Sequence, residues 1–275
     1  MEWKKDAENE VRNIPFFVRK KVRTRIEAQV SAAGKHIVTL ADVRTAQKRY
    51  LERMGEEIKG YQVDTCFGPG GCPHRTVASE GLLEKIEEAM TAADLLSFLK
   101  KQVSGDLKFH HEFRITLAEC PNACSQPQIK DIGIIGAILP RISDIACTLC
   151  GACVENCPDD CIRLNDTIEK PEIDMQRCLA CGKCVHACPT QTIQEKLQGF
   201  RVQIGGKLGR HPQLARELPG IYAENEVLEI IQHCIRFYRT HSRGGKRFAH
   251  IFREADFDDL ACNGPKPLSG DPIEE

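Results

Sequence analysis

Cysteine is the residue type best able to do chemistry in this sequence, and it occurs fifteen times among 275 residues. The chain reads CTLCGACVENCP from Cys147 and CLACGKCVHACP from Cys178, so one spacing of four cysteines before a proline occurs twice, 31 residues apart. Thiolates bind soft metals, and closely spaced cysteines in a reducing compartment favour metal binding over disulfides. The repeat therefore predicts two metal centres.

Each run has the spacing C-x2-C-x2-C-x3-C-P, which is typical of bacterial-type ferredoxins with two 4Fe-4S clusters, where the fourth cysteine of each run binds the other cluster. We assign one cluster to Cys147, Cys150, Cys153 and Cys188, and the second to Cys178, Cys181, Cys184 and Cys157. Zinc ribbons and inert core cysteines are the alternatives, but zinc sites typically use pairs of short C-x2-4-C knuckles. We therefore expect a two-cluster ferredoxin segment.

Cys161, in the stretch CPDDC, competes with Cys157 for the second cluster. The proline that follows Cys157 favours Cys157 as the ligand. Cys161, Cys234 and Cys262 are then expected to be structural or exposed thiols.

Four cysteines are left, Cys66 and Cys72 in a C-x5-C pair and Cys120 and Cys124 in a C-x3-C pair. Four soft ligands suffice for one more cluster, and the glycine-rich stretch CFGPGGCPHR suits a backbone packed against a bulky cofactor. Neither pair is specific by itself, and a structural zinc site is the alternative. We predict a third 4Fe-4S cluster.

Two strands are expected to position these residues. Apolar and polar residues alternate from Phe109 to Ala118, which predicts a half-buried strand that delivers the chain to Cys120. Its polar face carries Arg114, which can bind an anion through charge-assisted hydrogen bonds, although an ordinary solvated face is the alternative.

The second strand, 200–204, turns at Gly205-Gly206 into a basic stretch that contains Lys207, Arg210 and His211. Main-chain N–H groups of a glycine turn with nearby cations form a suitable cradle for an anion, and a plain basic turn is the alternative. A helix around 224–238 carries one apolar stripe, which predicts core packing.

The first sixty residues have a different pattern. Val18, Val22, Ile26 and Val30 recur every four residues before Gly34, which predicts an amphipathic helix that ends at a glycine cap. Ile14-Pro-Phe-Phe is expected to end a shorter helix before it, and a further helix is expected to start near Thr39, capped by Asp42.

The composition sets wider limits. The length allows one large domain or several small ones, and we expect three compact units. Lys+Arg 38 nearly cancels Asp+Glu 39, so no overall field indicates nucleic acid or an anionic membrane as a partner. No apolar run of about 18 residues occurs and the charged N-terminus lacks an apolar core, so we expect no membrane span, no signal peptide and a cytoplasmic location.

The stretches ECPNACSQPQIKDIGIIG around Cys120 and GFRVQIGGKLGRHPQLARE from Gly199, with the Cys66–Cys72 pair, resemble the siroheme-dependent sulfite and nitrite reductases, especially the dissimilatory type. The resemblance spans about residues 60 to 262. It implies that the four cysteines hold a 4Fe-4S cluster, that Cys124 also bridges to the siroheme iron, and that the ferredoxin repeat is an inserted domain. It also makes Lys207, Arg210 and His211 candidate ligands of the siroheme carboxylates, with Arg75, Lys130 and Arg141 as weaker candidates.

The segment from Trp3 to about Tyr50 resembles the small C-terminal domain of the catalytic subunit of light-independent protochlorophyllide reductase. A basic helical module that binds a protein is the alternative. The expected fold is α+β, with a helical domain at 1–58, a siroheme and 4Fe-4S domain at 59–140 and 195–262, a ferredoxin domain at 141–194 and a tail at 263–275.

In the reductase family, basic residues of the strand before the cysteine pair bind sulfite and deliver protons, so the resemblance implies that Arg114 is catalytic. Glu112 and Thr116 stand where the dissimilatory enzymes tend to have lysine, and a carboxylate there is expected to repel sulfite. The basic residues expected to compensate are His110, His111, Lys108, His74 and Arg75, of which His110 and Arg75 join Arg114 as our catalytic candidates.

Two functions follow as hypotheses. In the first, the chain is an oxidoreductase that takes electrons from a donor protein through its clusters and reduces sulfite to sulfide, or nitrite to ammonia, by six electrons. In the second, it is a three-cluster electron-transfer subunit without siroheme catalysis. A full reductase buries siroheme between two related halves and this chain supplies one, so we expect a homo-oligomer or a partner redox subunit.

Overall fold

The computed structural model describes residues 1–14 and 16–268 and divides into two compact units. The first contains Met1–Ile58 with Asp106–Lys108, and the second contains Lys59–Gly105 and the chain from Phe109 onward. Helices and a mixed sheet together give the α+β class that we expected. Within the described ranges, no helix is both long enough and apolar enough to cross a membrane.

The first unit consists of helices α1 (Lys5–Arg12), α2 (Phe16–Ala32) and α3 (Leu40–Glu56), with a parallel pair of short strands, β1 (Glu2–Trp3) and β2 (Ile37–Val38). Ile26 and Val30 of α2 are buried in its core, Val22 packs against that core, and Val18 is exposed. The predicted stripe therefore faces inward over the second half of α2 only. The Pro15 at which we expected the break lies outside the described residues.

Both predicted ends of these helices are confirmed. Gly34, which follows α2, has φ +71°, a conformation that glycine adopts freely. The main-chain N–H of Thr39 donates to Oδ2 of Asp42 at 2.9 Å, and the main-chain N–H of Asp42 donates to Oγ1 of Thr39 at 3.4 Å, which is a reciprocal cap at the start of α3.

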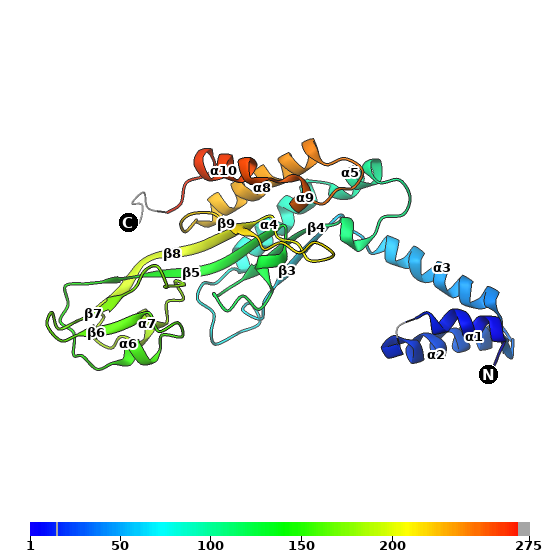
Figure 1. The fold of residues 1–275 in the computed structure, drawn as a ribbon, viewed down its shortest axis with the longest axis horizontal. Coiled ribbons are helices and arrows are strands. Elements are labelled where there is room, and N and C mark those ends of the chain that lie inside the picture. The colour runs from blue at the N-terminus through cyan, green and yellow to red at the C-terminus, as the bar shows by residue number, and fades with distance from the viewer. Residues whose placement is uncertain (15, 269–275) are drawn as a thin grey trace. The chain divides into compact units, whose positions relative to one another are not determined.

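The second unit is built on a five-stranded sheet in the order β3-β4-β5-β8-β9 (Figure 1). The strands are β3 (Tyr61–Thr65), β4 (Phe113–Ala118), β5 (Ile132–Ile142), β8 (Ile193–Ile204) and β9 (Arg216–Glu217). The first three are parallel, while β8 runs antiparallel to β5 and β9 antiparallel to β8. The C-terminal ends of β3 and β4 therefore lie side by side.

Helices cover one face of this sheet: α4 (Glu80–Ala92), α5 (Leu95–Gln102), α8 (Glu224–His241), α9 (Phe248–Ile251) and α10 (Glu254–Asn263) (Figure 1). The ring of Phe113 lies 5.4 Å from that of Tyr238 and 5.2 Å from that of Phe248, measured between centroids. The predicted stripe of α8 is buried, including Val227, Ile231 and Tyr238. The other face of β4 carries Arg114 and the fully buried Thr116, whose hydroxyl donates to the carbonyl of Asp64 at 3.1 Å.

Strand β4 starts later than the sequence predicted. Residues Phe109–His111 form a short 3-10 helix, and the strand begins at Phe113. The reason is the neighbouring strand, because β3 begins at Tyr61, which pairs with Phe113, and residues before Phe113 have no strand beside them.

Strands β5 and β8 form a long antiparallel pair, from Ile132 opposite Ile204 to Ile142 opposite Ile193. The chain between them carries two short helices, α6 (Ala152–Glu155) and α7 (Lys183–Ala187), and an antiparallel pair, β6 (Ile162–Asn165) and β7 (Lys170–Ile173). This connection contains both repeated cysteine runs. Its status as a separate domain stays a prediction.

Candidate functional site

The two cysteine runs fold alike. The main-chain N–H of Leu149 donates to Sγ of Cys147 at 3.3 Å, and that of Ala180 donates to Sγ of Cys178 at 3.4 Å. Left-handed residues recur 31 positions apart, at Leu149 (φ 52°) and Ala180 (φ 55°), Gly151 (φ 77°) and Gly182 (φ 72°), and Asp160 (φ 49°) and Gln191 (φ 58°). Non-glycine residues hold such angles only where their surroundings enforce them. The sequence repeat is therefore also a repeat in the backbone.

One thiol set lies around the first run. Burial raises the pKa of the Cys153 thiol, and the nearby thiols of Cys147 and Cys188 raise it further. Cys150 of the same run is exposed. The fold thus brings Cys188, from the second run, to the first run.

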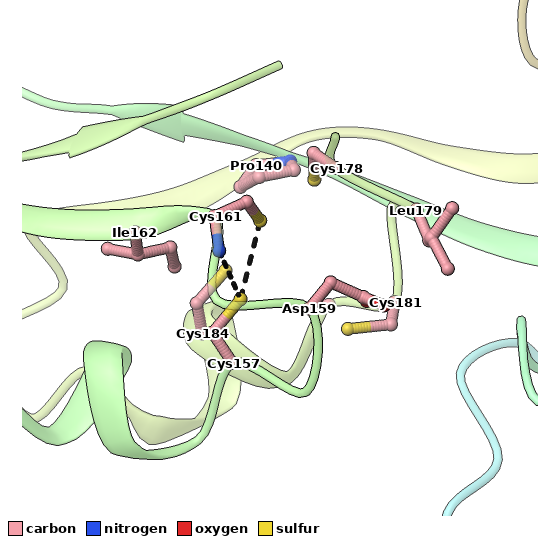
Figure 2. A pocket seen from close by; sticks show the side chains of 10 residues that line it. Pro140, Cys157, Asp159, Cys161, Ile162, Cys178, Leu179, Cys181 and Cys184 are labelled. Atoms are coloured by element: carbon pink, nitrogen blue, oxygen red, sulfur yellow. Dashed lines mark hydrogen bonds between the residues drawn. The ribbon is translucent and has the colours of Figure 1, made fainter. Parts of the chain in front are cut away.

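The second thiol set combines three cysteines of the second run with one cysteine of the first. Burial raises the pKa of the Cys184 thiol to about 12, and Cys178, Cys181 and Cys157 contribute to the rise. These four cysteines line one enclosed pocket (Figure 2). Cys157, from the first run, is therefore brought to the second run.

The remaining four cysteines meet at the C-terminal ends of β3 and β4. Burial raises the pKa of the Cys120 thiol, and the nearby thiols of Cys66, Cys124 and Cys72 raise it further. Sγ of Cys66 accepts the main-chain N–H of Glu119 at 3.3 Å, which ties the end of one strand to the other. Cys124 is the most open of the four, because it is exposed while the others are half-buried.

Glu119, the neighbour of Cys120, contacts the segment that carries Cys72. Its side chain is fully buried, and Oε1 accepts the main-chain N–H of Ser79 at 3.0 Å and its hydroxyl at 2.7 Å. Oε2 lies 3.2 Å from Nε of Arg75, in the loop that carries Cys72. The guanidinium of Arg75 also contacts Glu80 at 2.8 Å, so both of its known partners are carboxylates.

The second thiol set touches the four-cysteine site through Thr76. The hydroxyl of Thr76 donates to the carbonyl of Cys181 at 3.1 Å, and its main-chain N–H donates to the carbonyl of Glu119 at 2.8 Å. Glu119 is bonded directly to Cys120 in the chain. Two hydrogen bonds therefore link the second set to the four-cysteine site.

A group of basic residues lies at the N-terminal end of β4, near the Gly205-Gly206 turn. We call it the cationic end, and it contains Lys207, Arg247 and His250. A Cβ on Gly206 would lie 2.5 Å from the carbonyl oxygen of Gln128, so only glycine fits there. Lys207 is buried, and its Nζ lies 3.4 Å from the carbonyl oxygen of Ala249, on the wall of a pocket of about 430 Å³. Burial and the nearby Lys207 and Arg247 lower the pKa of His250 on the same wall, which indicates a positive environment.

Arg114 belongs to this cationic end. Its main-chain N–H donates to Oδ2 of the buried Asp131 at 2.9 Å, and Nη2 donates to the carbonyl of Phe109 at 3.1 Å, away from Cys120. Nε of Arg114 is buried without a hydrogen-bond partner, as are Nε and Nη2 of Arg247. The buried carboxylate of Asp131 lies near both guanidinium groups, and its Oδ1 is also without a hydrogen-bond partner, so the three side chains form one buried charged cluster.

The other predicted site residues have different positions, and among them His211 is close enough to His250 to affect its pKa. Arg210 and His211 are exposed on the loop after Lys207 and do not line the pocket. The rings of His110 and His111 lie 4.2 Å apart within the 3-10 helix. Lys130 is ion-paired to Asp64 at 2.6 Å, and Nη2 of Arg141 donates to the side chain of Gln194 at 3.0 Å.

Glu112 is not placed as we expected. It is buried, and its Oε1 accepts the main-chain N–H of Lys59 at 3.0 Å. Burial raises its pKa, with the neighbouring main-chain groups opposing the rise. Its carboxylate therefore binds the main chain that leads into β3. Arg114 is close enough to oppose the rise in its pKa, and the expected repulsion of sulfite stays a prediction.

Sequence reasoning missed Glu119, Asp131 and Arg247. The partners of Glu119 lie 40 and 44 positions away in the chain, so no local spacing reveals them. Arg247 could have been found in the sequence, because it directly follows a Gly-Gly-Lys stretch at 244–246 that matches the one at 205–207.

The donor sets fit the groups that the sequence implied. All fifteen cysteines are free thiols, and the four of the second set ring one enclosed space with main-chain N–H groups directed at sulfur, as a cluster requires. Within the described ranges, no three His, Cys, Asp or Glu side chains converge closely enough to hold one metal ion. The buried, unpaired donors of Arg114 and Arg247 fit a carboxylate-bearing group.

Known sulfite reductases are similar to this chain in sequence. The chain is 29% identical over 234 residues to a coenzyme F420-dependent sulfite reductase of Methanocaldococcus jannaschii, which covers 78% of this chain and 36% of that protein. It is 25% identical over 199 residues to one of the subunits of the anaerobic sulfite reductase of Salmonella typhimurium, covering 70% of this chain and 54% of that one. The chain thus spans about a third to a half of the length of these relatives.

The crystal structure of dissimilatory sulfite reductase I superposes on 83% of this chain and 60% of its own, with a TM-score of 0.50 and 16% sequence identity, so the two share a fold. Residues 3–47 match the family of the proto-chlorophyllide reductase 57 kD subunit, as the N-terminal resemblance implied. Residues 58–262, which hold both the thiol sets and the cationic end, match the nitrite and sulphite reductase 4Fe-4S domain, and the chain belongs to that family.

Proposed function

We propose that this protein is a siroheme and iron-sulfur oxidoreductase of the sulfite reductase type. The observation that carries the proposal is the four-cysteine site, where the ends of β3 and β4 gather Cys66, Cys72, Cys120 and Cys124 and leave Cys124 exposed. An exposed thiol beside three half-buried ones suits a residue that binds a cluster on one side and a second metal centre on the other. The family match supports the same reading.

The residues have separate roles in this proposal. The four-cysteine site and the two repeated sets would hold three 4Fe-4S clusters, and siroheme would lie between Cys124 and the cationic end. When bound, the clusters supply one-electron transfer and the siroheme supplies the six-electron reduction of sulfite to sulfide. Lys207 and Arg247 would bind siroheme carboxylates, with Arg210 and His211 as outer candidates on the exposed loop.

Arg114 and His110 are our candidates for binding the anionic substrate and supplying protons. The buried, unpaired Nε of Arg114 supports a role in anion binding. A catalytic role for Arg75 fits less well, because Glu119 and Glu80 occupy its guanidinium. We propose instead that Arg75 fixes the loop that carries Cys72.

The contacts of Thr76 support an order for the thiol sets. Thr76 joins Cys181 of the second set to Glu119, the neighbour of Cys120, while no bond of this kind is found for the first set within the described residues. We infer that the second set stands next to the four-cysteine site and that the first set faces the electron-donor protein. A homo-oligomer or a partner redox subunit would complete the siroheme cleft, since this chain spans only part of its relatives.

The test is an optical spectrum and an iron count of anaerobically purified protein. A siroheme absorption band with about thirteen irons per chain, from three four-iron clusters and one haem iron, is expected. A broad cluster spectrum without a haem band would reject siroheme catalysis and leave a three-cluster electron-transfer subunit. Turnover with sulfite and with nitrite then identifies the substrate.

Cys124→Ser tests the bridging role. We expect it to abolish the coupling between the haem and cluster signals in electron paramagnetic resonance. Cys262→Ser is the matched control, because Cys262 is also exposed but belongs to none of the three sets. Unchanged haem spectra and turnover in Cys124→Ser would refute the role.

A further inference from the structure

A fifth thiol lies inside the second cysteine set. Sγ of Cys161 is 3.3 Å from Sγ of Cys157, and the main-chain N–H of Cys161 donates to the same sulfur at 3.4 Å. Cys161 lines the enclosed pocket together with Cys157, Cys178, Cys181 and Cys184 (Figure 2). It is buried, and its side chain is also within hydrogen-bonding reach of Cys178. Five thiols therefore surround a space in which a cluster needs four.

The internal repeat places a different residue at the position equivalent to this fifth thiol. Cys161 corresponds to Thr192, 31 positions later, just as Cys157 corresponds to Cys188. Thr192 is fully buried, and its hydroxyl donates to the carbonyl of Ala146 at 3.1 Å. A hydroxyl thus takes the equivalent position beside the first set. The two sets therefore differ there in whether a thiol is present that could bind iron.

We propose that Cys161 is a reserve ligand of the second cluster, able to replace Cys157 as its fourth thiolate. The inference rests on the proposed function, because it assumes that the second set holds a 4Fe-4S cluster. In the exchange, the iron–sulfur bond to Cys157 breaks and one to Cys161 forms. The proton of the Cys161 thiol passes to the sulfur of Cys157 across the 3.3 Å contact, so no electron is gained or lost.

The position of the second set explains why a reserve ligand would matter there. Thr76 links this set to the four-cysteine site, and no such link to the first set is found among residues 1–14 and 16–268. Loss of one ligand here would break the connection between the electron input and the catalytic end. A reserve thiol keeps a four-thiolate site available at that point, since a thiolate is a far better iron ligand than the hydroxyl at Thr192.

The experiment compares Cys157→Ala with Cys188→Ala, its counterpart in the repeat. Iron and acid-labile sulfide are counted in anaerobic full-length protein, and the reduced clusters are recorded by electron paramagnetic resonance. We expect Cys157→Ala to keep the iron content of the parent, and Cys188→Ala to lose about four irons. Cys161→Thr alone should keep its clusters, and Cys157→Ala combined with Cys161→Thr should lose about four.

A loss of about four irons in Cys157→Ala, or full retention in Cys188→Ala, would overturn the proposal while leaving the proposed function intact. A parent protein without two ferredoxin-type clusters would reject the proposed function itself, and the reserve ligand with it. If the alanine variant does not fold, Cys157→Ser is measured in the same way. Its retained irons must then be lost when Cys161→Thr is added, or the proposal fails.

Discussion

Glu119→Ala should destabilise the loop that carries Cys66 and Cys72. The substitution leaves the buried N–H and hydroxyl of Ser79 without an acceptor, and each buried, unsatisfied donor costs about 1–3 kcal/mol. Arg75 adds little, because its side chain is 31% exposed and keeps Glu80. We therefore expect the free energy of unfolding of the second unit to fall by about 2–6 kcal/mol, the cost of leaving these two buried donors unsatisfied.

The assay is urea unfolding followed by far-ultraviolet circular dichroism, with amide hydrogen exchange of residues 66–77 as the local measurement. Glu119→Gln keeps an oxygen for Ser79 and should lose no more than about 1 kcal/mol, since only the charged partner of the partly exposed Arg75 is removed. Glu80→Ala is the matched control, because it removes the exposed carboxylate from the same guanidinium. Equal loss of stability and equal exchange in Glu119→Ala and Glu80→Ala would refute the reasoning.

Three further predictions use other residues of the second unit. Burial raises the pKa of Asp131 to about 6, so its contribution to stability is fully present below about pH 4 and is lost as the pH rises through 6. The asparagine of Asp131→Asn does not ionise, so the free energy of unfolding of this variant should gain up to about 3 kcal/mol over the parent between pH 4 and 7, measured by urea unfolding. Gly206→Ala should lower the melting temperature while Gly81→Ala, whose Cβ meets nothing within 4 Å, should not; equal melting temperatures would contradict the close approach. Thr76→Val should slow electron arrival at the four-cysteine site in stopped-flow reduction without changing the iron content, and an unchanged rate would reject the inferred order of the thiol sets.

The repeated cysteine runs could be predicted in detail because their spacing acts locally. Three cysteines of each run lie within one short stretch, and the left-handed residues Leu149 and Ala180 occur in that stretch. The buried stripes of α2 and α8 were also readable, since helical periodicity reflects the face that packs.

The polar contacts could not be predicted in this way. Alternation from Phe109 suggested a longer strand, but strand length depends on the neighbour, and β3 offers no partner before Phe113. Glu112 was expected to face an anion, yet it is used by the main chain of Lys59, 53 positions earlier. Such pairings depend on tertiary structure, which the order of residues does not show.

The long pairing of β5 with β8 has a consequence for how this family can diversify. Ile142 and Ile193 are register partners, so the whole connection 143–192 leaves and re-enters the sheet at a single rung, where paired α-carbons are only about 5 Å apart. A tight hairpin turn bridges such a gap. The connection 143–192 can therefore differ in length or sequence without changing the register of the sheet that holds Cys120.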